Sequence, residues 1–223
     1  MDIKKIGLEN DKMKLKAEKV AIVLIEPQND FLSEGGTMYA HIKEQLHERN
    51  VIANLQYLLE NARGKVAKVF YVPFHGYEKG FPELKKGGPG YEGLRGIEID
   101  MEADWGTGAW LKGTPGPEII PQLTPKKGDV VIEGKKTLDA FHSTALDYLL
   151  RANEIETVAF TGFHTNWCVE STARSAYDKG YRVMVIGDCT ATDTQEEQDY
   201  AEKFIFPKIG KVMSSKEFLE ALE

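Results

Sequence analysis

Short apolar runs alternate along this chain with amphipathic segments, and that alternation constrains the fold more than any other feature. The runs, rich in β-branched residues, lie at 19–26, 65–74, 128–134, 157–163 and 181–188. Apolar residues at helical spacing occupy 41–62, 143–155, 166–180, 194–205 and the tail at 214–223. Strands that alternate with crossover helices predict a mostly parallel sheet with helices on both faces. We therefore expect an α/β fold that forms a single domain over residues 1–223.

The composition of the chain argues against nucleic acid and membranes as partners. The 223 residues carry 28 Lys and Arg against 35 Asp and Glu, and no basic cluster stands out, so nucleic acid is not expected as a partner. The longest apolar run, residues 20–25, is far too short to span a membrane, and the N-terminus lacks the apolar stretch of a secretory signal. Two cysteines do not make a disulfide framework. We expect a cytoplasmic protein with two free thiols.

Residues 76–116 break the regular alternation. This stretch is rich in Gly and polar residues, and its aromatic residues are Tyr77, Phe81, Tyr91, Trp105 and Trp110. A loop of this length inside a compact α/β domain is usually functional or disordered, and the aromatic content argues against disorder. We expect it to cover a pocket, although its aromatic residues can equally form a core beneath the loop.

Three chemically useful residues follow three of the predicted strands. Glu26 ends the first apolar run, Lys135 follows the third, and Cys168 follows the fourth. Ligands of open parallel sheets bind at the carboxyl ends of the strands, where these residues would meet. A nucleophile, an acid and a cation are the components of a covalent hydrolase. Each residue alone has a simpler interpretation: core packing for Cys168, a loop salt bridge for Glu26, and a solvated charge for Lys135.

The position of Cys168 favours reactivity. Thr165 or Asn166 can cap the following helix, which would place the thiol near unpaired N–H groups and the positive end of the helix dipole. Such a setting, with a nearby cation, lowers a thiol pKa from about 8.5 to roughly 3.5–7.5. Cys189, at the end of the fifth apolar run, is expected to be a buried packing residue.

Three segments resemble the isochorismatase-like cysteine hydrolases, a superfamily that includes nicotinamidases and carbamoyl-amide hydrolases. They are VLIEPQNDF (23–31), VIEGKKTLDAF (131–141) and TGFHTNWCVESTARSAYDKGY (161–181), and the resemblance extends over about 20–192. It implies a Rossmann-like three-layer sandwich and a catalytic triad of Glu26, Lys135 and Cys168. It also implies a cis peptide before His164, an oxyanion hole formed by the backbone N–H groups of His164 and Cys168, and a homo-oligomer (a dimer or tetramer). The tail helix and the aromatic loop offer apolar surface for such assembly.

The chain departs from the family pattern at two places. The family usually has Asp where this chain has Glu26, and Asp30 is a rival acid, although it lies beyond the end of the strand. Nicotinamidase-type members carry an Asp-x-His metal motif after the second strand, whereas this chain has YVPFHGYEKG. We expect no metal and no cofactor. Candidate residues for binding substrate are Phe31, His75, Trp105 and Trp167.

Together these features predict a cysteine hydrolase that cleaves an amide-type C–N bond (amide, carbamoyl or lactam) of a small molecule through a thioester. Two alternatives stay open. One is vinyl-ether hydrolysis, although family members with that activity lack the nucleophilic Cys. The other is a catalytically silent binding domain, which the Glu26 substitution allows.

Overall fold

Six strands form one sheet in the order β3-β2-β1-β4-β5-β6 in the computed structural model, which describes residues 13–89 and 110–223. Every neighbouring pair of strands is parallel. The strands are β1 (Val20–Ile25), β2 (Lys68–Val72), β3 (Val130–Val131), β4 (Thr157–Phe163), β5 (Arg182–Ala191) and β6 (Gly210–Met213). This order reverses direction between β1 and β4, as in Rossmann-type folds. The predicted α/β class is confirmed.

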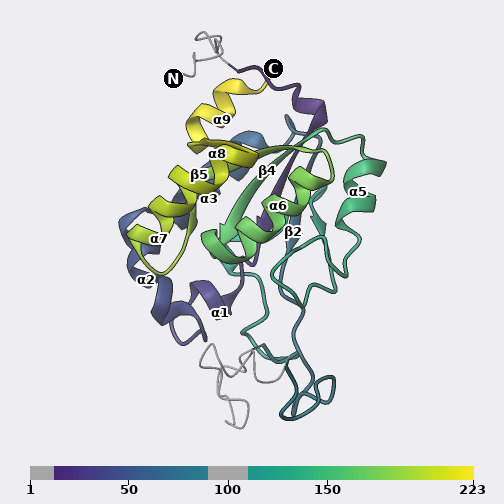
Figure 1. Ribbon diagram of the computed structural model, residues 1–223, viewed down its shortest axis with the longest axis vertical. Coiled ribbons are helices and arrows are strands. Elements are labelled where there is room, and N and C mark those ends of the chain that lie inside the picture. The colour runs from purple at the N-terminus through teal and green to yellow at the C-terminus, as the bar shows by residue number, and fades with distance from the viewer. Residues whose placement is uncertain (1–12, 90–109) are drawn as a thin grey trace, which may run out of the picture.

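Helices cover both faces of the sheet, and β1 divides its side chains between them. Val20, Ile22 and Leu24 belong to one apolar cluster, whereas the alternate residues of β1 belong to the other. The first cluster includes residues of α2 (Tyr39–Glu48), α3 (Val51–Ala62) and α9 (Ser215–Ala221). The second includes residues of α5 (Leu146–Ala152), α6 (Glu170–Asp178) and α8 (Phe206–Ile209). Figure 1 shows α6 and α3 on opposite sides of the sheet.

The remaining helical segments are short. They are η1 (Ala17–Lys19), α1 (Asn29–Leu32), η2 (Pro121–Leu123), η3 (Thr165–Val169), α7 (Gln195–Tyr200) and η4 (Ala201–Ile205), of which η3 and η4 are π-helical turns. Among residues 13–89 and 110–223, none of the helices combines the length and apolar character that crossing a bilayer requires.

The structure corrects the predicted elements in two places. The helix expected over 41–62 is two helices, because Asn50 between them adopts a left-handed conformation with φ of 54°. The strand β6 was not predicted. In the tail helix α9, Phe218 is fully buried in the chain's own core, and Leu219 is only partly buried.

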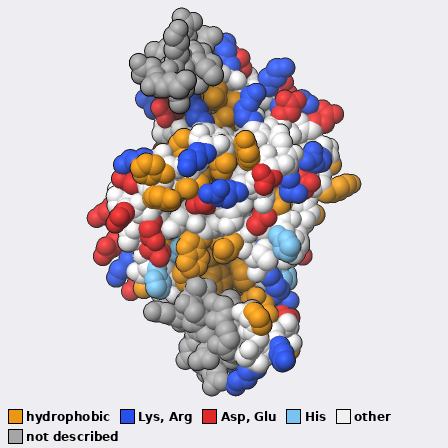
Figure 2. All heavy atoms as spheres, in the orientation of Figure 1, with side chains coloured by type: hydrophobic (Ala, Val, Ile, Leu, Met, Phe, Trp, Pro, Cys, Tyr) orange, Lys and Arg blue, Asp and Glu red, His pale blue; other side chains and the backbone are white. Residues whose placement is uncertain are grey.

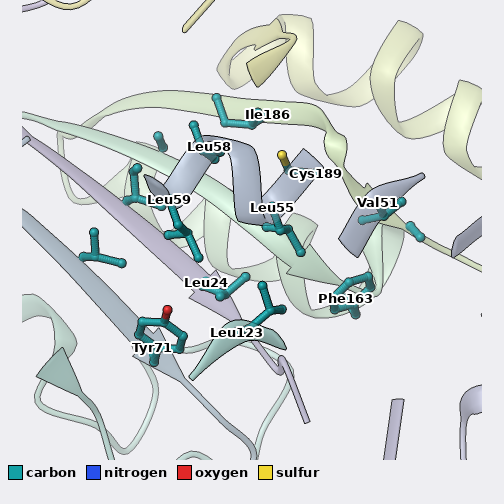
Figure 3. Packing of buried hydrophobic residues seen from close by; sticks show 14 of the residues in the cluster. Leu24, Val51, Leu55, Leu58, Leu59, Tyr71, Leu123, Phe163, Ile186 and Cys189 are labelled. Atoms are coloured by element: carbon teal, nitrogen blue, oxygen red, sulfur yellow. The ribbon is translucent and has the colours of Figure 1, made fainter. Parts of the chain in front are cut away.

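The first apolar cluster also contains Cys189, which is fully buried. Figure 3 shows its sulfur among apolar side chains that include Leu55 of α3 and Ile186 of β5. The prediction that Cys189 is a buried packing residue is confirmed.

Candidate active site

Glu26, Lys135 and Cys168 meet at the carboxyl ends of β1 and β4, where the strand order reverses. Lys135 Nζ donates a hydrogen bond to Glu26 Oε1, and both side chains are buried, with exposures of 0% and 1%. Glu26 and Lys135 lie close enough to the Cys168 thiol to shift its pKa, Glu26 upward and Lys135 downward. The second carboxylate oxygen, Glu26 Oε2, is buried and has no hydrogen-bond partner among the described residues. The three predicted residues therefore form one buried cluster.

Close contact between β1 and β4 depends on Gly162. This residue has a φ of +108°, and a Cβ built on it would lie 2.0 Å from the carbonyl oxygen of Ile25. Only glycine permits that approach without displacing the backbone. The contact brings the residue after β1, Glu26, against the segment after β4 that leads to Cys168.

Cys168 lies in the π-helical turn η3 rather than in a regular first turn of α6. The carbonyl oxygen of His164 accepts from Trp167 N at 3.2 Å and from Val169 N at 3.1 Å, which widens the turn around Cys168. Such π turns occur frequently at functional sites. The peptide between Phe163 and His164 is cis, as the resemblance implies. A backbone hydrogen bond from His164 reaches the Cys168 thiol, which places one predicted oxyanion donor beside the sulfur.

Neither Thr165 nor Asn166 caps a helix through its side chain, so that expectation was wrong. The Thr165 hydroxyl instead donates to Gln198 Oε1 at 2.7 Å, and the Asn166 side chain accepts from Thr192 Oγ1. Both side chains thus bond to the stretch of chain that follows β5.

The thiol rests in its protonated form. Burial and the Glu26 carboxylate raise the pKa of Cys168 well above its usual value, and these effects outweigh Lys135 and the His164 N–H, which lower it. The expected low thiol pKa is therefore wrong for the resting site. Burial opposes the charge of Lys135, but Glu26 and Cys168 raise its pKa overall, so Lys135 is an ammonium ion. The site is arranged as a neutral thiol beside a buried ion pair.

Asp30, the rival acid, has a different role. It is fully buried, and its carboxylate accepts from Trp110 N at 3.0 Å and from Thr37 Oγ1 at 3.1 Å. Burial raises the pKa of this carboxyl. A Cβ on Gly116 would lie 2.6 Å from its carboxylate oxygens. Asp30 thus anchors the end of the long loop against α1, and the geometry favours Glu26 as the acid of the site.

A row of aromatic rings leads from the loop toward the nucleophile. The ring of Phe31 lies 4.9 Å from Trp110 and 5.7 Å from His164, between centroids. Trp110 is also 4.8 Å from Phe74, and His164 is 5.8 Å from Trp167. In Figure 2, hydrophobic side chains gather on the lower half of the molecule, at the end where Figure 1 places α1. Apolar, aromatic lining of this kind suits a small-molecule site.

Sequence reasoning did not assign Trp110 to the site. Trp110 is buried and has a φ of 55°, a conformation that is rare for a bulky residue. Nothing in the sequence reports a positive φ at tryptophan. The only signal was its place among the aromatic residues of the long loop.

Of the four residues predicted to bind substrate, three lie in the described part of the chain. Phe31 and Trp167 both belong to the aromatic row. His75 is half-buried, and its backbone N–H donates to Lys135 O at 2.6 Å, which ties it to the site. Trp105, together with the middle of the predicted loop, lies outside the described residues. Within 13–89 and 110–223, no three His, Cys, Asp or Glu side chains are grouped as metal ligands.

The family of the chain follows from comparison with known proteins. The isochorismatase domain matches residues 20–217, so this protein belongs to the isochorismatase family. Its parallel sheet with helices on both faces agrees with the fold that the resemblance implies.

The sequence identity to individual relatives is modest. The chain is 36% identical to the uncharacterized isochorismatase family protein YwoC of Bacillus subtilis over 132 residues, 59% of this chain and 64% of YwoC. It is 31% identical to the ureidoacrylate amidohydrolase RutB of Rhizobium rhizogenes over 180 residues, 79% of this chain and 72% of RutB. The N-carbamoylsarcosine amidase of Thermoplasma acidophilum shares the fold, with a TM-score of 0.65 and 28% identity over 88% of this chain and 96% of that one.

Proposed function

We propose that this protein is a cysteine hydrolase that cleaves an amide-type C–N bond of a small molecule through a thioester on Cys168. One observation carries the proposal. A protonated thiol lies against a buried carboxylate whose other oxygen is held by an ammonium ion, with a backbone N–H directed at the sulfur. Nucleophile, base and orienting group are in contact, which is the arrangement that covalent catalysis requires.

The first half-reaction begins with proton transfer. Glu26 Oε2 takes the proton of the Cys168 thiol, and the sulfur attacks the carbonyl carbon of the substrate. The carbonyl π bond breaks as the S–C bond forms, and the resulting oxyanion is held by the backbone N–H of His164 and by that of Cys168. Glu26 then gives its proton to the leaving nitrogen, so that the C–N bond breaks and ammonia or an amine departs. Lys135, hydrogen-bonded to Glu26 Oε1, orients the carboxyl group for both proton transfers.

The second half-reaction uses the same acid. Glu26 accepts a proton from a water molecule, and the hydroxide attacks the thioester carbonyl. The S–C bond breaks, and Glu26 returns its proton to the sulfur, which regenerates the neutral thiol. One carboxyl group that alternates between base and acid suffices for both halves. These steps involve only Glu26, Lys135, Cys168 and backbone N–H groups.

A carbamoyl group is the first substrate chemistry to test. RutB and the Thermoplasma acidophilum enzyme are named for ureidoacrylate and N-carbamoylsarcosine, and both names denote carbamoylated amines. The aromatic row beside Cys168 supports a small, flat substrate. Vinyl-ether hydrolysis is disfavoured because the structure gives Cys168 both a base and an oxyanion donor.

Release of ammonia from a panel of small molecules tests the proposal. The panel contains ureidoacrylate, N-carbamoylsarcosine, nicotinamide and a lactam, and each is assayed with wild type and with Cys168→Ala. We expect Cys168-dependent turnover of at least one carbamoyl or amide compound. Iodoacetamide labelling near neutral pH tests the silent-domain alternative: in an active site Cys168 reacts much faster than Cys189. Equal, slow labelling of both thiols together with an inactive panel would contradict the proposal.

We also infer a homo-oligomer in a reducing compartment such as the cytoplasm. Both cysteines are free, and the rings of Tyr200 and Phe204 are exposed side by side, 5.6 Å apart. Exposed aromatic pairs of this kind are enriched at protein interfaces. Light scattering should give a multiple of the 25.0 kDa chain mass at micromolar concentration; a monomer would contradict the inference.

A further inference from the structure

Three consecutive residues next to the thiol each lie against a side chain from one stretch that follows β5. His164 Nδ1 lies 3.3 Å from Asp193 Oδ1, although the two atoms form no hydrogen bond. Thr165 Oγ1 donates to Gln198 Oε1 at 2.7 Å, and Thr192 Oγ1 donates to the side chain of Asn166. We call Thr192, Asp193 and Gln198 the clamp. None of them belongs to the segments that carry Glu26, Lys135 or Cys168.

Gln198 is the most constrained member of the clamp. It is fully buried, and while Oε1 accepts from Thr165, its Nε2 donates to Thr190 Oγ1 at 3.0 Å and to Glu202 Oε1 at 2.6 Å. Both ends of the amide are therefore committed. A buried amide with all its partners in place has one orientation, since losing any of them leaves an unpaired polar group.

The hydrogen-bond network continues from Gln198 to α2 and β5. Glu202 Oε1 also accepts from Arg49, the residue after α2, at 3.0 Å. The same guanidinium donates to the carbonyl oxygen of Gly187 in β5 at 2.8 Å. The clamp is thus fixed to α2 and β5, two elements outside the active site, so it gives the π turn a rigid support.

We propose that the clamp residues are positioning residues that hold the His164 N–H where the oxyanion forms, an inference that rests on the proposed function. An oxyanion donor works only when it is fixed within about 2.7–3.1 Å of the developing charge. A π-helical turn that lacks side-chain capping does not by itself fix that N–H. The clamp supplies the constraint through its hydrogen bonds to the side chains of Thr165 and Asn166 and touches no reacting atom.

Two reagents for the same sulfur separate positioning from general structural support. Propionaldehyde forms a thiohemiacetal: the S–C bond forms, the carbonyl π bond breaks, and the charge on oxygen needs the His164 N–H before the thiol proton arrives through Glu26. Iodoacetamide alkylates the sulfur by displacing iodide, and no oxyanion develops. A loose oxyanion donor therefore weakens aldehyde binding but leaves alkylation unchanged.

Thr165→Val removes the hydrogen bond to Gln198 and keeps the shape of the side chain, whereas Thr165→Ser keeps the hydroxyl. Protection of Cys168 from iodoacetamide by propionaldehyde gives the dissociation constant. We expect Thr165→Val to raise that constant about 10- to 100-fold and to lower kcat by the same factor with KM little changed, since one oxyanion donor is worth about 10²–10³ in kcat. Alkylation without aldehyde should stay within about threefold of wild type, and Thr165→Ser should recover most of the loss.

Thr157→Val is the matched control, because Thr157 is a buried threonine at the amino end of β4, away from the site. It should change neither reaction. Thr192→Val, which removes the separate bond to Asn166, repeats the test if Thr165→Val does not fold. The proposal is overturned if aldehyde binding and alkylation fall together, or if the Val and Ser variants of Thr165 behave alike. A wild-type Cys168 that is inert to both reagents would overturn the proposed function and this inference with it.

Discussion

The two cysteines of this protein share burial and a neighbouring carboxylate and differ in their other neighbours. Cys168 is 5% exposed and Cys189 is 0% exposed, and burial raises the pKa of both thiols. Cys168 lies against a carboxylate, an ammonium ion and a backbone N–H, whereas Cys189 has the Asp188 carboxylate beside it and otherwise packs among aliphatic side chains of α3 and β5 (Figure 3). Burial alone therefore does not distinguish a nucleophile from a packing residue. Both thiols have a carboxylate beside them, and the distinction lies in the ammonium ion and the backbone N–H donor that accompany it at Cys168.

The largest expected contrast comes from removing each sulfur in turn. Cys168→Ala should abolish turnover, because no other group in the site can form the thioester. Cys189→Ala should keep near-wild-type turnover and lower the free energy of unfolding by about 1 kcal/mol, the central cost of point mutations. Ammonia release and urea unfolding of the two variants measure both effects. Similar turnover in the two variants would remove the functional difference between the thiols.

The second contrast concerns the carboxylate beside Cys168. Glu26→Gln should lower turnover by about 10²–10⁴-fold, since the amide can neither take the thiol proton nor protonate the leaving nitrogen. Asp30→Asn should affect the chemical step far less, because Asp30 holds Trp110 and Thr37 rather than Cys168. Single-turnover rates separate the two variants. A larger loss of rate for Asp30→Asn than for Glu26→Gln would show that Asp30, and not Glu26, is the acid of the site.

The third contrast concerns the buried ion pair of Lys135 and Glu26 and its contribution to the free energy of unfolding. Lys135→Met leaves Glu26 as an unpaired buried charge, and breaking a buried pair in this way costs about 3–5 kcal/mol of unfolding free energy. Among the described residues, no buried ion pair contacts Cys189. The small loss of unfolding free energy in Cys189→Ala therefore serves as the reference. Urea unfolding at pH 7 checks the difference. A Lys135→Met protein as stable as Cys189→Ala would show that Glu26 is not charged in the folded state.

The smallest effect is one that the two thiols share. Both have folded-state pKa values above the ordinary 9.0, so their stabilising contribution is full below pH 9 and is lost as the pH rises toward the folded values. The free energy of unfolding should therefore be lower at pH 10 than at pH 8 on account of each thiol. Cys189→Ala should remove the part of this decrease in unfolding free energy that Cys189 causes, and Cys168→Ala should remove the part that Cys168 causes. An unchanged pH dependence in either variant would show that its thiol titrates normally when folded.

Much of the fold and the core of the site could be predicted from the sequence. Glu26, Lys135 and Cys168 each follow an apolar run, and parallel strands bring such positions to one edge of a sheet. The strand β6 and the break between α2 and α3 were not predicted, because neither is marked by a long apolar run or by a helix-breaking residue. The strand β6 has only four residues, Gly210–Met213, and the break between α2 and α3 depends on the backbone of Asn50 rather than on a Gly or Pro.

The local environment of the nucleophile could not be predicted, for a physical reason. The pKa of Cys168 depends on how far burial outweighs Lys135, and this balance follows from the packing of distant segments. Thr165 and Gln198 are 33 positions apart, and nothing in either residue type announces their hydrogen bond. A capping residue and a buried network residue look alike in sequence.

Intact-protein mass spectrometry after a rapid acid quench tests the thioester most directly. Wild-type protein mixed with a slowly turned-over amide or carbamoyl compound should carry the acyl mass of that compound. Digestion should map this mass to the peptide that contains Cys168 and never to the one that contains Cys189. An active protein that shows no adduct, and whose Cys168→Ala variant keeps near-wild-type turnover, would contradict the account.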